Sequence, residues 1–580
     1  MTFAGVRLER DQPAPMTDGV ILRADIYRPG EDGRYPVLLQ RTPYNKRFAQ
    51  TGVYQHPAWY ARRGYIVAVQ DTRGRFASDG IFEPYRDEAQ DGADSVAWAA
   101  SLEGSTGKVG TFGFSYAGAN QLLAAAKRPP GLACTAVGCA GSDFFDGWTY
   151  RGGALQLAFV ISWTVQALAL PEAMRRGDTK QANRIRLLAA DLRAAYERPL
   201  GDWIASGELP EFFTTWITSD RKDEYWNSLS LEPFLDRIAV PCLHLGGWYD
   251  IFLPGTLKTY AALTRHAACD PRRSQFLAVG PWQHVPWSRL NGTVDHGEAG
   301  DNCANDLQIA WFDHWLKDKP LGIEAKTVRY FVMGSNRWEE DDDWPPSNLE
   351  TVKLYLHSTG SAARRLTDGR LSPELPGDEE PDIFVYDPGE PVPSVGGASC
   401  CRSDIAPIGI YDQRSVEARP DVLVYTTSAL ETDCTIAGPI ELDLYATTDA
   451  TDTDWTAKLV DVHPDGAALN VCDGIVRARF RDSLERPVLL EPGKVYQYAI
   501  SLGATAIQFK SGHAIRLEIS SSSFPNYDVN LNREESGLDP LEGMPATQIV
   551  WHDRERPSHL ALPVRGVWLN GGATRRGKSS

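Results

Sequence analysis

The sequence predicts an α/β domain that is interrupted by a helical insert and followed by an all-β domain. In the first half, short apolar runs of strand length alternate with helical stretches, which is typical of a mostly parallel sheet. Between about residues 144 and 238 strand signals vanish, and apolar residues recur every three or four positions. From about residue 350, short alternating strands separated by Gly/Pro turns indicate a β-sandwich or jelly roll.

These changes of pattern divide the chain. We expect the α/β domain to comprise residues 1–143 and 239–349, the helical cap insert residues 144–238, and the jelly roll residues 350–580. A chain of 580 residues is too long for one hydrophobic core, so several domains are expected on length alone.

The individual elements follow from local patterns. The expected strands of the α/β domain are the apolar runs 36–41, 65–70, 109–112, 239–245 and 276–279. Helices are expected over 87–102 and over 305–316, and the second should close this domain. In the insert, the apolar residues at helical spacing are Ile185, Leu188, Ala189 and Leu192. In the last domain, alternating strands are expected at 352–357, 440–448 and 514–520.

The most informative stretch is KVGTFGFSYAGANQLLAAA, residues 108–126. A β-branched run leads into a tight turn at Ser115, and a segment of high helix propensity follows at once. A serine between a strand and a helix, flanked by small residues, is typical of a nucleophile elbow. The usual pattern is G-x-S-x-G, whereas here Ala117 takes the last position and Gly118 comes one residue later. The other interpretation, an ordinary tight turn, stays open on this motif alone.

Two partners follow in the order that a serine hydrolase needs. Asp250 comes after the apolar run AVPCLHL and a Gly-Gly turn, and His284 comes after the apolar run FLAV. All three residues would lie just past the carboxyl ends of strands, where an open α/β sheet presents its ligand-facing groups. The order Ser, Asp, His is that of the α/β hydrolases. Such a serine is activated by an imidazole, and a carboxylate fixes the imidazole tautomer. A core histidine and a helix-capping aspartate are the structural alternatives.

Several longer segments resemble one branch of this superfamily. In the first half they are MTDGVILRADIYRP (16–29), RTPYNK (41–46), VQDTRGRFASDG (69–80), GFSYAG (113–118), GGWYD (246–250) and GPWQH (280–284). In the second half they are YDQRSVEARPDVLVYTT (411–427), AKLVDVHPDG (457–466), CDGIVRARFR (472–481) and SSSSFPNYD (520–528). The chain resembles the cocaine esterase branch, with relatives among the α-amino-acid ester hydrolases and X-prolyl dipeptidyl aminopeptidases. The resemblance implies a serine acyl hydrolase made of an α/β hydrolase domain, a helical cap and a C-terminal jelly roll.

The oxyanion hole can be assigned in part. An elbow supplies the backbone N–H of the residue after the nucleophile, here Tyr116. A second donor is expected after the strand at 36–41, and the resemblance implies the hydroxyl of Tyr44. A structural tyrosine packed beside Pro43 is the alternative.

The resemblance also implies an aromatic acyl pocket. Trp148, Trp163 and Phe252 match its aromatic positions, whereas Cys400 and Cys401 stand where the family pattern has bulky apolar residues. We expect these vicinal cysteines to be small lining residues without a redox role. Relatives specialised for α-amino-acid esters place acidic residues directly after the triad aspartate, but here the next four residues are IFLP. The sequence therefore predicts hydrolysis of acyl or aromatic carboxylic esters and shows no carboxylate cage for an amine.

Two other functions stay open. An X-prolyl dipeptidyl aminopeptidase or an amide acylase could use the same scaffold, although the former would need acidic residues to hold a free N-terminus. A non-catalytic binding protein could use the jelly roll as a ligand-binding module, but the intact Ser, Asp and His order argues against it.

Composition sets the expected setting and partners. The net charge of −17 argues against nucleic acid or an anionic membrane as partner. Nine scattered cysteines suggest reduced thiols, and the N-terminal residues show no apolar signal region, so a cytoplasmic protein is expected. No cofactor and no metal site are expected, since the sequence contains no C-x-x-C pair or His/Cys cluster. The expected partner is a small-molecule ester, and a homodimer is left open.

Three features invite other interpretations. The apolar run 154–170 approaches the length of a membrane span but carries polar residues and stops at Pro171, so a buried cap helix is expected. Residues 572–579 fit the P-loop pattern without a helix to follow, so we expect a basic tail. The acidic run 339–343 is expected to be a solvated loop.

Overall fold

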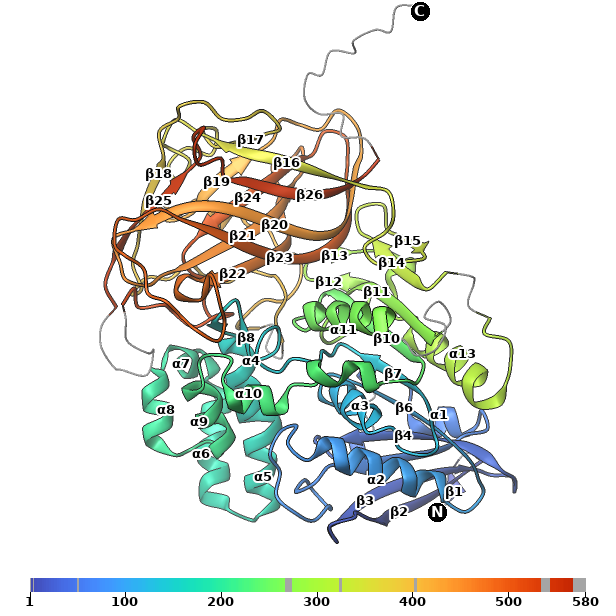
Figure 1. Cartoon of the computed structure of the whole chain (residues 1–580). Coiled ribbons are helices and arrows are strands. Elements are labelled where there is room, and N and C mark those ends of the chain that lie inside the picture. The colour runs from blue at the N-terminus through green and yellow to red at the C-terminus, as the bar shows by residue number, and fades with distance from the viewer. Residues whose placement is uncertain are drawn as a thin grey trace, which may run out of the picture.

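The computed structural model describes residues 2–3, 5–48, 52–266, 274–322, 326–400, 404–533 and 543–566. Figure 1 shows three parts: an α/β domain, a group of teal helices beside it, and a β domain in yellow to red that lies against both. This is the α/β hydrolase fold with a helical insert and a C-terminal β domain that the sequence predicts. The basic tail at 572–579 lies outside the described residues.

A mixed, mostly parallel sheet forms the centre of the α/β domain. Its strands, in spatial order, are β1 (Thr2–Phe3), β2 (Val6–Pro15), β3 (Ile21–Pro29), β5 (Ile66–Asp71), β4 (Tyr35–Thr42), β6 (Ser105–Phe114), β7 (Leu132–Gly138), β10 (Cys242–Tyr249), β11 (Gln275–Gln283), β14 (Val328–Val332) and β15 (Arg337–Asp341). The strands from β5 to β14 run parallel, while β1 to β3 and β15 are antiparallel additions at the two edges.

Helices cover both faces of this sheet. They are α1 (Pro57–Ala61), α2 (Glu88–Ala100), α3 (Tyr116–Ala126), α11 (Leu253–His266) and α13 (Ala304–Lys317). Successive residues of a strand point to opposite faces, and β4 follows this rule. Leu38 packs in the cluster that contains α1 and α13, while Val37 and Leu39 pack with α2. Both faces of the sheet are buried under helices, which explains why the sequences of these strands are continuous apolar runs.

Two expected elements differ from the structure. The run expected as a strand at 239–245 begins only at Cys242 and continues to Tyr249, because Pro241 precedes it and the Gly-Gly pair extends β10 beside β11. The prediction that the acidic run at 339–343 is a solvated loop is wrong in part. Residues up to Asp341 belong to β15, which pairs with β14, and Glu339 faces Arg565 of the β domain. The α/β domain therefore does not close at α13, because β14 and β15 follow that helix.

The insert is helical, as expected, apart from the short hairpin of β8 (Tyr150–Arg151) and β9 (Ala154–Leu155). Its helices are α4 (Leu157–Ser162), the π-helical turn η2 (Trp163–Ala169), α5 (Leu170–Arg175), α6 (Thr179–Ala190), α7 (Leu192–Glu197), α8 (Leu200–Ser206), α9 (Glu211–Thr218), α10 (Glu224–Leu229) and the 3-10 helix η3 (Glu232–Arg237). Ile185 and Leu192 are fully buried, which confirms the apolar face predicted for this segment.

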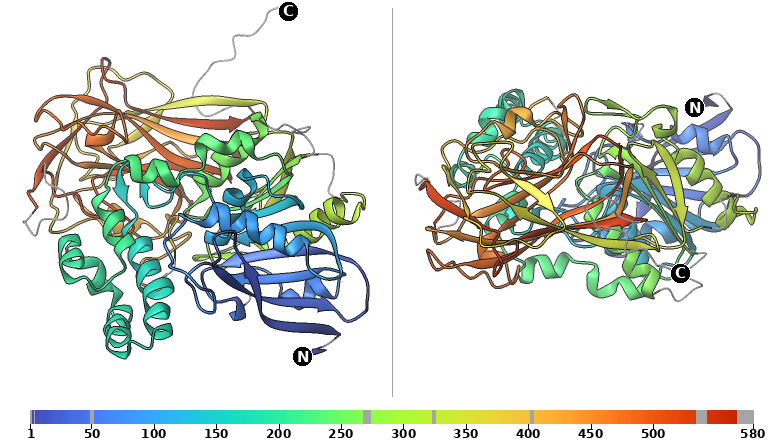
Figure 2. Two further views of the ribbon diagram at one scale, coloured as in Figure 1. Left: turned by 60° about the horizontal axis from the view of Figure 1, so that its bottom comes forward. Right: turned by 90° about the horizontal axis from the view of Figure 1, so that it is seen from above.

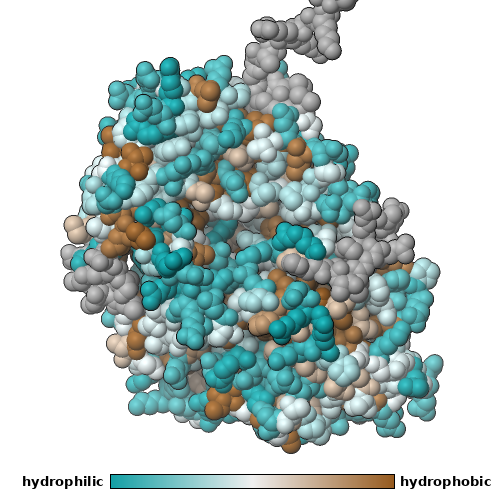
Figure 3. Space-filling view, in the orientation of Figure 1, coloured by the Kyte–Doolittle hydropathy of each residue, from teal (hydrophilic) through white to brown (hydrophobic). Residues whose placement is uncertain are grey.

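One helical segment of the insert is long and apolar enough to cross a membrane by length and composition. It runs over Leu157–Arg175, and 67% of its apolar window is buried inside the protein. A core helix passes the same test, and the burial favours the cap helix that the sequence predicts. The face in Figure 3 carries small, scattered hydrophobic patches over a mostly hydrophilic surface.

The C-terminal β domain is one large, strongly curved set of strands. They are β16 (Leu349–His357), β17 (Arg370–Ser372), β18 (Asp382–Tyr386), β19 (Leu423–Thr426), β20 (Cys434–Thr448), β21 (Asp454–Val462), β22 (Ala468–Arg477), β23 (Tyr496–Phe509), β24 (Ala514–Ser520), β25 (Ala546–Trp551) and β26 (His559–Arg565), with a short helix α14 (Arg414–Glu417). Figure 2 shows these strands wrapping around a core beside the insert and the α/β domain. The core cluster includes Val332 and Met333 of the α/β domain, so the two domains share apolar packing.

Candidate active site

Three polar residues follow directly on three strands of the central sheet. Ser115 follows β6, Asp250 follows β10 and His284 follows β11. These strands and β7 are neighbours in one parallel array, so their carboxyl ends meet at a single edge of the sheet. The sheet therefore brings the three residues to one edge, as predicted from their order in the sequence.

Ser115 occupies a strained turn. Its φ of 60° and ψ of −130° lie where side chains other than glycine rarely go, at a cost of about 1–3 kcal/mol. A Cβ atom on Gly113 would lie 2.6 Å from the carbonyl oxygen of Ala117, and one on Gly118 would lie 2.6 Å from that of Gly138. The elbow thus needs glycine at 113 and 118, while alanine is accommodated at 117. This explains why the sequence departs from G-x-S-x-G without losing the turn.

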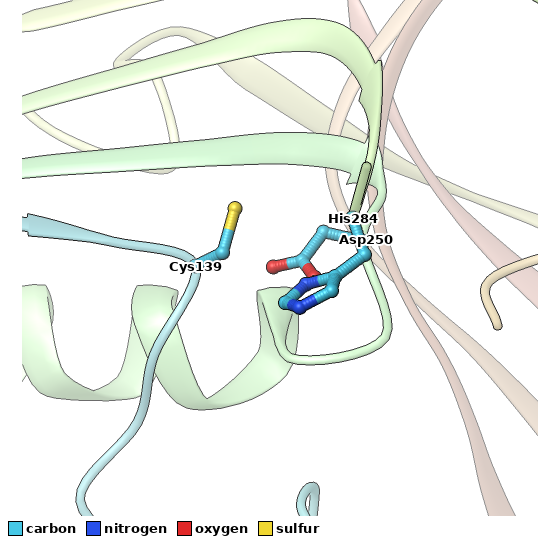
Figure 4. Close-up of side chains that lie close together, drawn as sticks. All are labelled: Cys139, Asp250 and His284. Atoms are coloured by element: carbon cyan, nitrogen blue, oxygen red, sulfur yellow. The ribbon is translucent and has the colours of Figure 1, made fainter. Parts of the chain in front are cut away.

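His284 and Asp250 form a buried pair. His284 Nδ1 lies 2.7 Å from Asp250 Oδ1, and Figure 4 shows the imidazole and the carboxylate side by side. Asp250 is fixed by a tight turn in which its N–H donates to Gly247 and its carbonyl accepts from Leu253. With Nδ1–H donating to the carboxylate, Nε2 of His284 is left with a lone pair that can accept a proton.

A third side chain, Cys139, faces this pair and was missed by sequence reasoning. Its Sγ, a carboxylate oxygen of Asp250 and a ring nitrogen of His284 lie within 4.8 Å of one another (Figure 4). Burial, followed by the charge of Asp250, raises the pKa of the Cys139 thiol well above its usual value. The thiol is therefore protonated and presents an S–H group toward the carboxylate. No local motif marked it, because Cys139 simply follows β7.

Ser115 is 9% exposed and lies at the same edge of the sheet as this pair. The ring of Phe114 packs 5.7 Å from that of His284, centroid to centroid. Within the described ranges, no hydrogen bond joins Ser115 Oγ to His284, and in unliganded enzymes this contact is often long. The Ser115 hydroxyl lies close enough to Tyr44 to lower the pKa of that phenol.

Tyr44 comes from the loop after β4 and meets the insert. Trp163 Nε1 donates a hydrogen bond of 2.8 Å to its hydroxyl oxygen. Burial raises the pKa of Tyr44 to about 12, although the hydrogen bonds from Trp163 and Ser115 oppose this shift. The phenol therefore keeps its proton, and because its oxygen already accepts from Trp163, its O–H is available as a donor.

Tyr116 begins helix α3, so its N–H is one of the first-turn donors without a partner in the helix. Its side chain has a separate role: the hydroxyl donates to Glu88 Oε1 at 2.9 Å and accepts from the N–H of Tyr85. Glu88 also accepts from Arg41 at 2.6 Å. This buried network ties the strand that precedes Tyr44 to the helix that carries Tyr116.

Arg75 also holds the loop that carries Tyr44, and no pattern in the sequence indicates this role. Its guanidinium is buried and donates to the carbonyls of Pro43, Leu168 and Ala167 at 3.0–3.2 Å. Burial lowers the pKa of Arg75 to about 10, so it remains charged at neutral pH. The residue belongs to the VQDTRGRFASDG segment, and only its three long-range acceptors reveal its role.

The three predicted pocket aromatics lie in one buried cluster. Trp148 stacks on Phe252 at 3.8 Å between ring centroids, and Phe252 meets the His284 ring edge-on at 5.0 Å. Trp163 stacks on Trp216 at 5.6 Å. Phe159, which the sequence did not single out, lies between Trp163 and Phe252.

The β domain contributes a loop to this site. Ser399 forms an isolated β-bridge with Asp250, and Cys400 is buried in the same cluster as the aromatic residues. Cys400 is disulfide-bonded, so the expectation of reduced thiols is wrong for this residue. That Cys400 lines the acyl pocket stays a prediction. Cys401 lies outside the described residues.

A cavity of about 720 Å³ opens beside Tyr44. Its lining is mainly apolar and includes Phe48, Phe76 and Met174, with Arg47 and Arg175 at its margin. Pockets of this size and character accommodate small organic molecules.

Comparisons with known proteins agree with this geometry. Residues 18–286 match the model of the X-Pro dipeptidyl-peptidase (S15 family), and residues 323–561 match the X-Pro dipeptidyl-peptidase C-terminal non-catalytic domain. Cocaine esterase of Rhodococcus sp. (strain MB1 Bresler) is 37% identical over 95% of this chain and 97% of its own length.

Two solved structures share the whole architecture. An aminopeptidase from a marine sediment Thaumarchaeota archaeon gives a TM-score of 0.82 at 25% identity, with 97% of each chain covered. An α-amino acid ester hydrolase gives a TM-score of 0.77 at 24% identity, with 97% of this chain and 98% of that chain covered, and so shows the fold alone.

Proposed function

This chain belongs to the family of serine ester hydrolases that includes cocaine esterase, and from that premise we propose that Ser115 is the nucleophile of ester hydrolysis. The observation that carries the proposal is the strained turn at Ser115 beside the Asp250–His284 pair. A strained strand-to-helix turn is costly, and such cost is typical of catalytic positions. The chain is an enzyme, so a purely ligand-binding role is excluded.

The proposed reaction has two halves. Ser115 Oγ attacks the ester carbonyl while its proton passes to His284 Nε2, and the tetrahedral intermediate expels the alcohol, which takes that proton. Water then attacks the acyl-enzyme and gives a proton to His284, and the second tetrahedral intermediate breaks its bond to Ser115 Oγ. The serine takes the proton back from His284 Nε2, and the carboxylic acid is released. Asp250 holds the imidazole by the 2.7 Å contact and stabilises its positive charge.

The developing oxyanion would be held by two donors. The N–H of Tyr116 has no partner within α3 because it begins that helix, and the O–H of Tyr44 is available because its oxygen accepts from Trp163. Donors that are fixed before the reaction act at a water-poor site without the cost of reorganising solvent. Arg75 would act as a positioning residue, since it holds the loop that carries Tyr44.

The acyl group would occupy the aromatic cluster. Trp148 and Phe252 stack beside His284, and Trp163 closes the side toward the insert. Ile251 and Phe252, which follow Asp250, are buried and apolar. This lining favours benzoyl or phenylacetyl esters over substrates with an α-ammonium group, because a buried ammonium without a partner carries a high desolvation cost. The same argument weighs against Xaa-Pro dipeptides with a free N-terminus.

The first test combines labelling with a substrate panel. A fluorophosphonate probe should react with Ser115, as located by mass spectrometry of the labelled peptide, and Ser115→Ala should remove the label. Acyl esters, acyl amides and Xaa-Pro amides should then be compared by kcat/KM, with the esters expected to be favoured. Labelling elsewhere in the chain overturns the assignment of the nucleophile, while faster cleavage of Xaa-Pro amides assigns the peptidase activity instead.

We also propose a cytoplasmic location, supported by six free thiols among the described cysteines, although the disulfide at Cys400 argues the other way. Fractionation of the host cells tests it. A homodimer stays a proposal from the sequence, and sedimentation velocity on the purified protein tests it directly.

A further inference from the structure

A second cluster of reactive side chains lies in the β domain. Asp461 is the next-to-last residue of strand β21, His463 directly follows this strand, and His513 directly precedes strand β24. In the pairing of these strands Asp461 is opposite Ile515 and Val462 is opposite Ala514. The same register places His463 opposite His513, and Asp461, two residues earlier, on the same face as His463.

The donor atoms of the three residues converge. Asp461 Oδ1 lies 2.9 Å from His513 Nδ1, and Asp461 Oδ2 lies 3.3 Å from His463 Nε2. One ligand atom from each residue fits within a mutual distance of 4.8 Å, and the two imidazole rings are 4.3 Å apart. A tetrahedral ion with ligands at about 2.0–2.2 Å needs donor separations of about 3.3–3.6 Å. The cluster therefore needs only small side-chain movements to surround such an ion.

The backbone holds the two histidines in place. The N–H of His463 donates to Ala467 and its carbonyl accepts from Gly466, which fixes the turn after β21. The N–H of His513 donates to Lys510 and its carbonyl accepts from Leu430. The imidazoles thus project from two tight turns and not from long, free loops.

A second, independent observation points into the same cavity. The cluster lines a cavity of about 270 Å³ between the β domain and the α/β domain, and His296 lines it from the α/β side. His296 is buried, its Nδ1 lies 3.1 Å from Asn336 Oδ1, and within the described part of the chain its Nε2 has no hydrogen-bond partner. An imidazole that is held at Nδ1 and has an unpartnered Nε2 is arranged as metal-ligating histidines are.

Among the described residues that line this cavity, the lysine is already engaged. Lys510 Nζ contacts Gln508 Oε1 and lies 3.4 Å from Asp433 Oδ2, so its charge is directed to another carboxylate.

We propose that Asp461, His463 and His513 form a binding site for a divalent transition ion of the Zn²⁺ class. His296, which lines the same cavity but lies outside the 4.8 Å group, would turn toward the ion as the fourth ligand across the domain boundary. Imidazole nitrogens with one carboxylate suit Zn²⁺ and its neighbours, whereas Ca²⁺ and Mg²⁺ require oxygen ligands. The ion would replace the two carboxylate–imidazole contacts and join the β domain to the α/β domain. This site is independent of the ester hydrolysis proposed above.

The test uses the full-length protein with any histidine tag removed and bound metal stripped by a chelator. Zn²⁺ is added, and the bound ion is counted by mass spectrometry after gel filtration and titrated by calorimetry, with Mg²⁺ as the negative ion. We expect one Zn²⁺ per chain and a higher Tm with Zn²⁺. Co²⁺ should give the visible absorption of a four-coordinate N/O site without a thiolate band.

Variants locate the ion. His463→Ala and His513→Ala should each weaken Zn²⁺ binding at least 100-fold, and His296→Gln about tenfold. His314→Ala is the matched control on α13, and His284→Ala tests the group of Cys139, Asp250 and His284 as a competing site. Both control variants should bind Zn²⁺ with the same affinity and stoichiometry as the unaltered protein. If an alanine variant fails to fold by circular dichroism, His463→Gln and His513→Gln take its place.

Three outcomes overturn the proposal. They are the absence of stoichiometric Zn²⁺ in the unaltered protein, binding that survives in both the His463 and His513 variants, and binding that is lost in His284→Ala. Unchanged affinity in His296→Gln overturns the fourth ligand and the joining of the two domains.

Discussion

The indole Nε1–H of Trp163 donates to the hydroxyl oxygen of Tyr44 across 2.8 Å, and this bond joins the helical insert to the loop after β4. Trp163 begins the π-helical turn η2, and Arg75 binds carbonyls later in the same turn. The insert therefore does more than cover the site, because it orients a proposed oxyanion donor contributed by the α/β domain.

Tyr44→Phe removes one hydroxyl and keeps the ring. If the O–H stabilises the oxyanion, kcat should fall by about 10²–10³-fold while KM changes little, because the donor acts on charge that forms in the transition state. Steady-state kinetics and Tm should be measured together, with Tyr35→Phe, whose exposed hydroxyl donates to Glu31, as the control. A lower Tm with near-normal kcat assigns Tyr44 a structural role. Since the pKa of Tyr44 is raised to about 12, the phenol stays protonated below that pH, and ionisation of Tyr44 should not limit kcat up to about pH 10.

Ser115→Ala should abolish turnover above the residual rate that binding and the oxyanion hole supply. The alanine methyl fits the same turn, so the circular dichroism spectrum and Tm should stay close to those of the unaltered protein, or rise slightly. Full esterase activity in this variant would falsify the role of Ser115 as nucleophile.

Phenylacetyl esters should be better substrates than phenylglycine esters with the same alcohol. The residues after Asp250 are buried and apolar, so an ammonium in the acyl pocket loses water without gaining a carboxylate, at a cost of a few kcal/mol. The comparison is made by kcat/KM at a pH where the amine is protonated. A clear preference for the amino ester contradicts the apolar pocket.

Gly118→Ala should lower both Tm and activity. The new methyl would lie 2.6 Å from the carbonyl oxygen of Gly138, and such overpacking costs about 1–3 kcal/mol by moving α3 away from β7. Gly377→Ala is the matched control, since its Cβ would meet no atom within 4 Å. Equal Tm values for the two variants would show that the elbow tolerates a larger residue.

His244 should contribute to acid sensitivity. Burial lowers its pKa to about 4 from 6.5, so the folded protein binds fewer protons than the unfolded chain. Above pH 6.5 His244 is neutral in both states and does not lower the free energy of unfolding. As pH falls from 6.5 toward 4, the unfolded chain takes up this proton first, and the free energy of unfolding decreases by about 3 kcal/mol. His244→Gln should flatten the dependence of Tm on pH in that window, whereas His314→Gln should not. Parallel curves for the His244 variant and the unaltered protein refute the assignment.

Local patterns in the sequence were sufficient for much of the candidate site. The strand, turn and helix around Ser115 can be predicted from propensity, and parallel strands bring their carboxyl ends together, so the places of Asp250 and His284 follow. The acidic run at 339–343 could not be predicted as a strand, because its pairing depends on β14 and its charges depend on residues such as Arg565.

The sequence by itself determined the α/β hydrolase fold, the helical insert, the β domain and the chain order of Ser115, Asp250 and His284, because each is encoded by local periodicity or by a strand end. Only the tertiary structure decided that Cys139 faces the Asp250–His284 pair, that Trp163 binds Tyr44, and that His296 lines one cavity with His463 and His513. These contacts join residues far apart in the chain. Their distances depend on sheet register and domain packing, which no local pattern encodes.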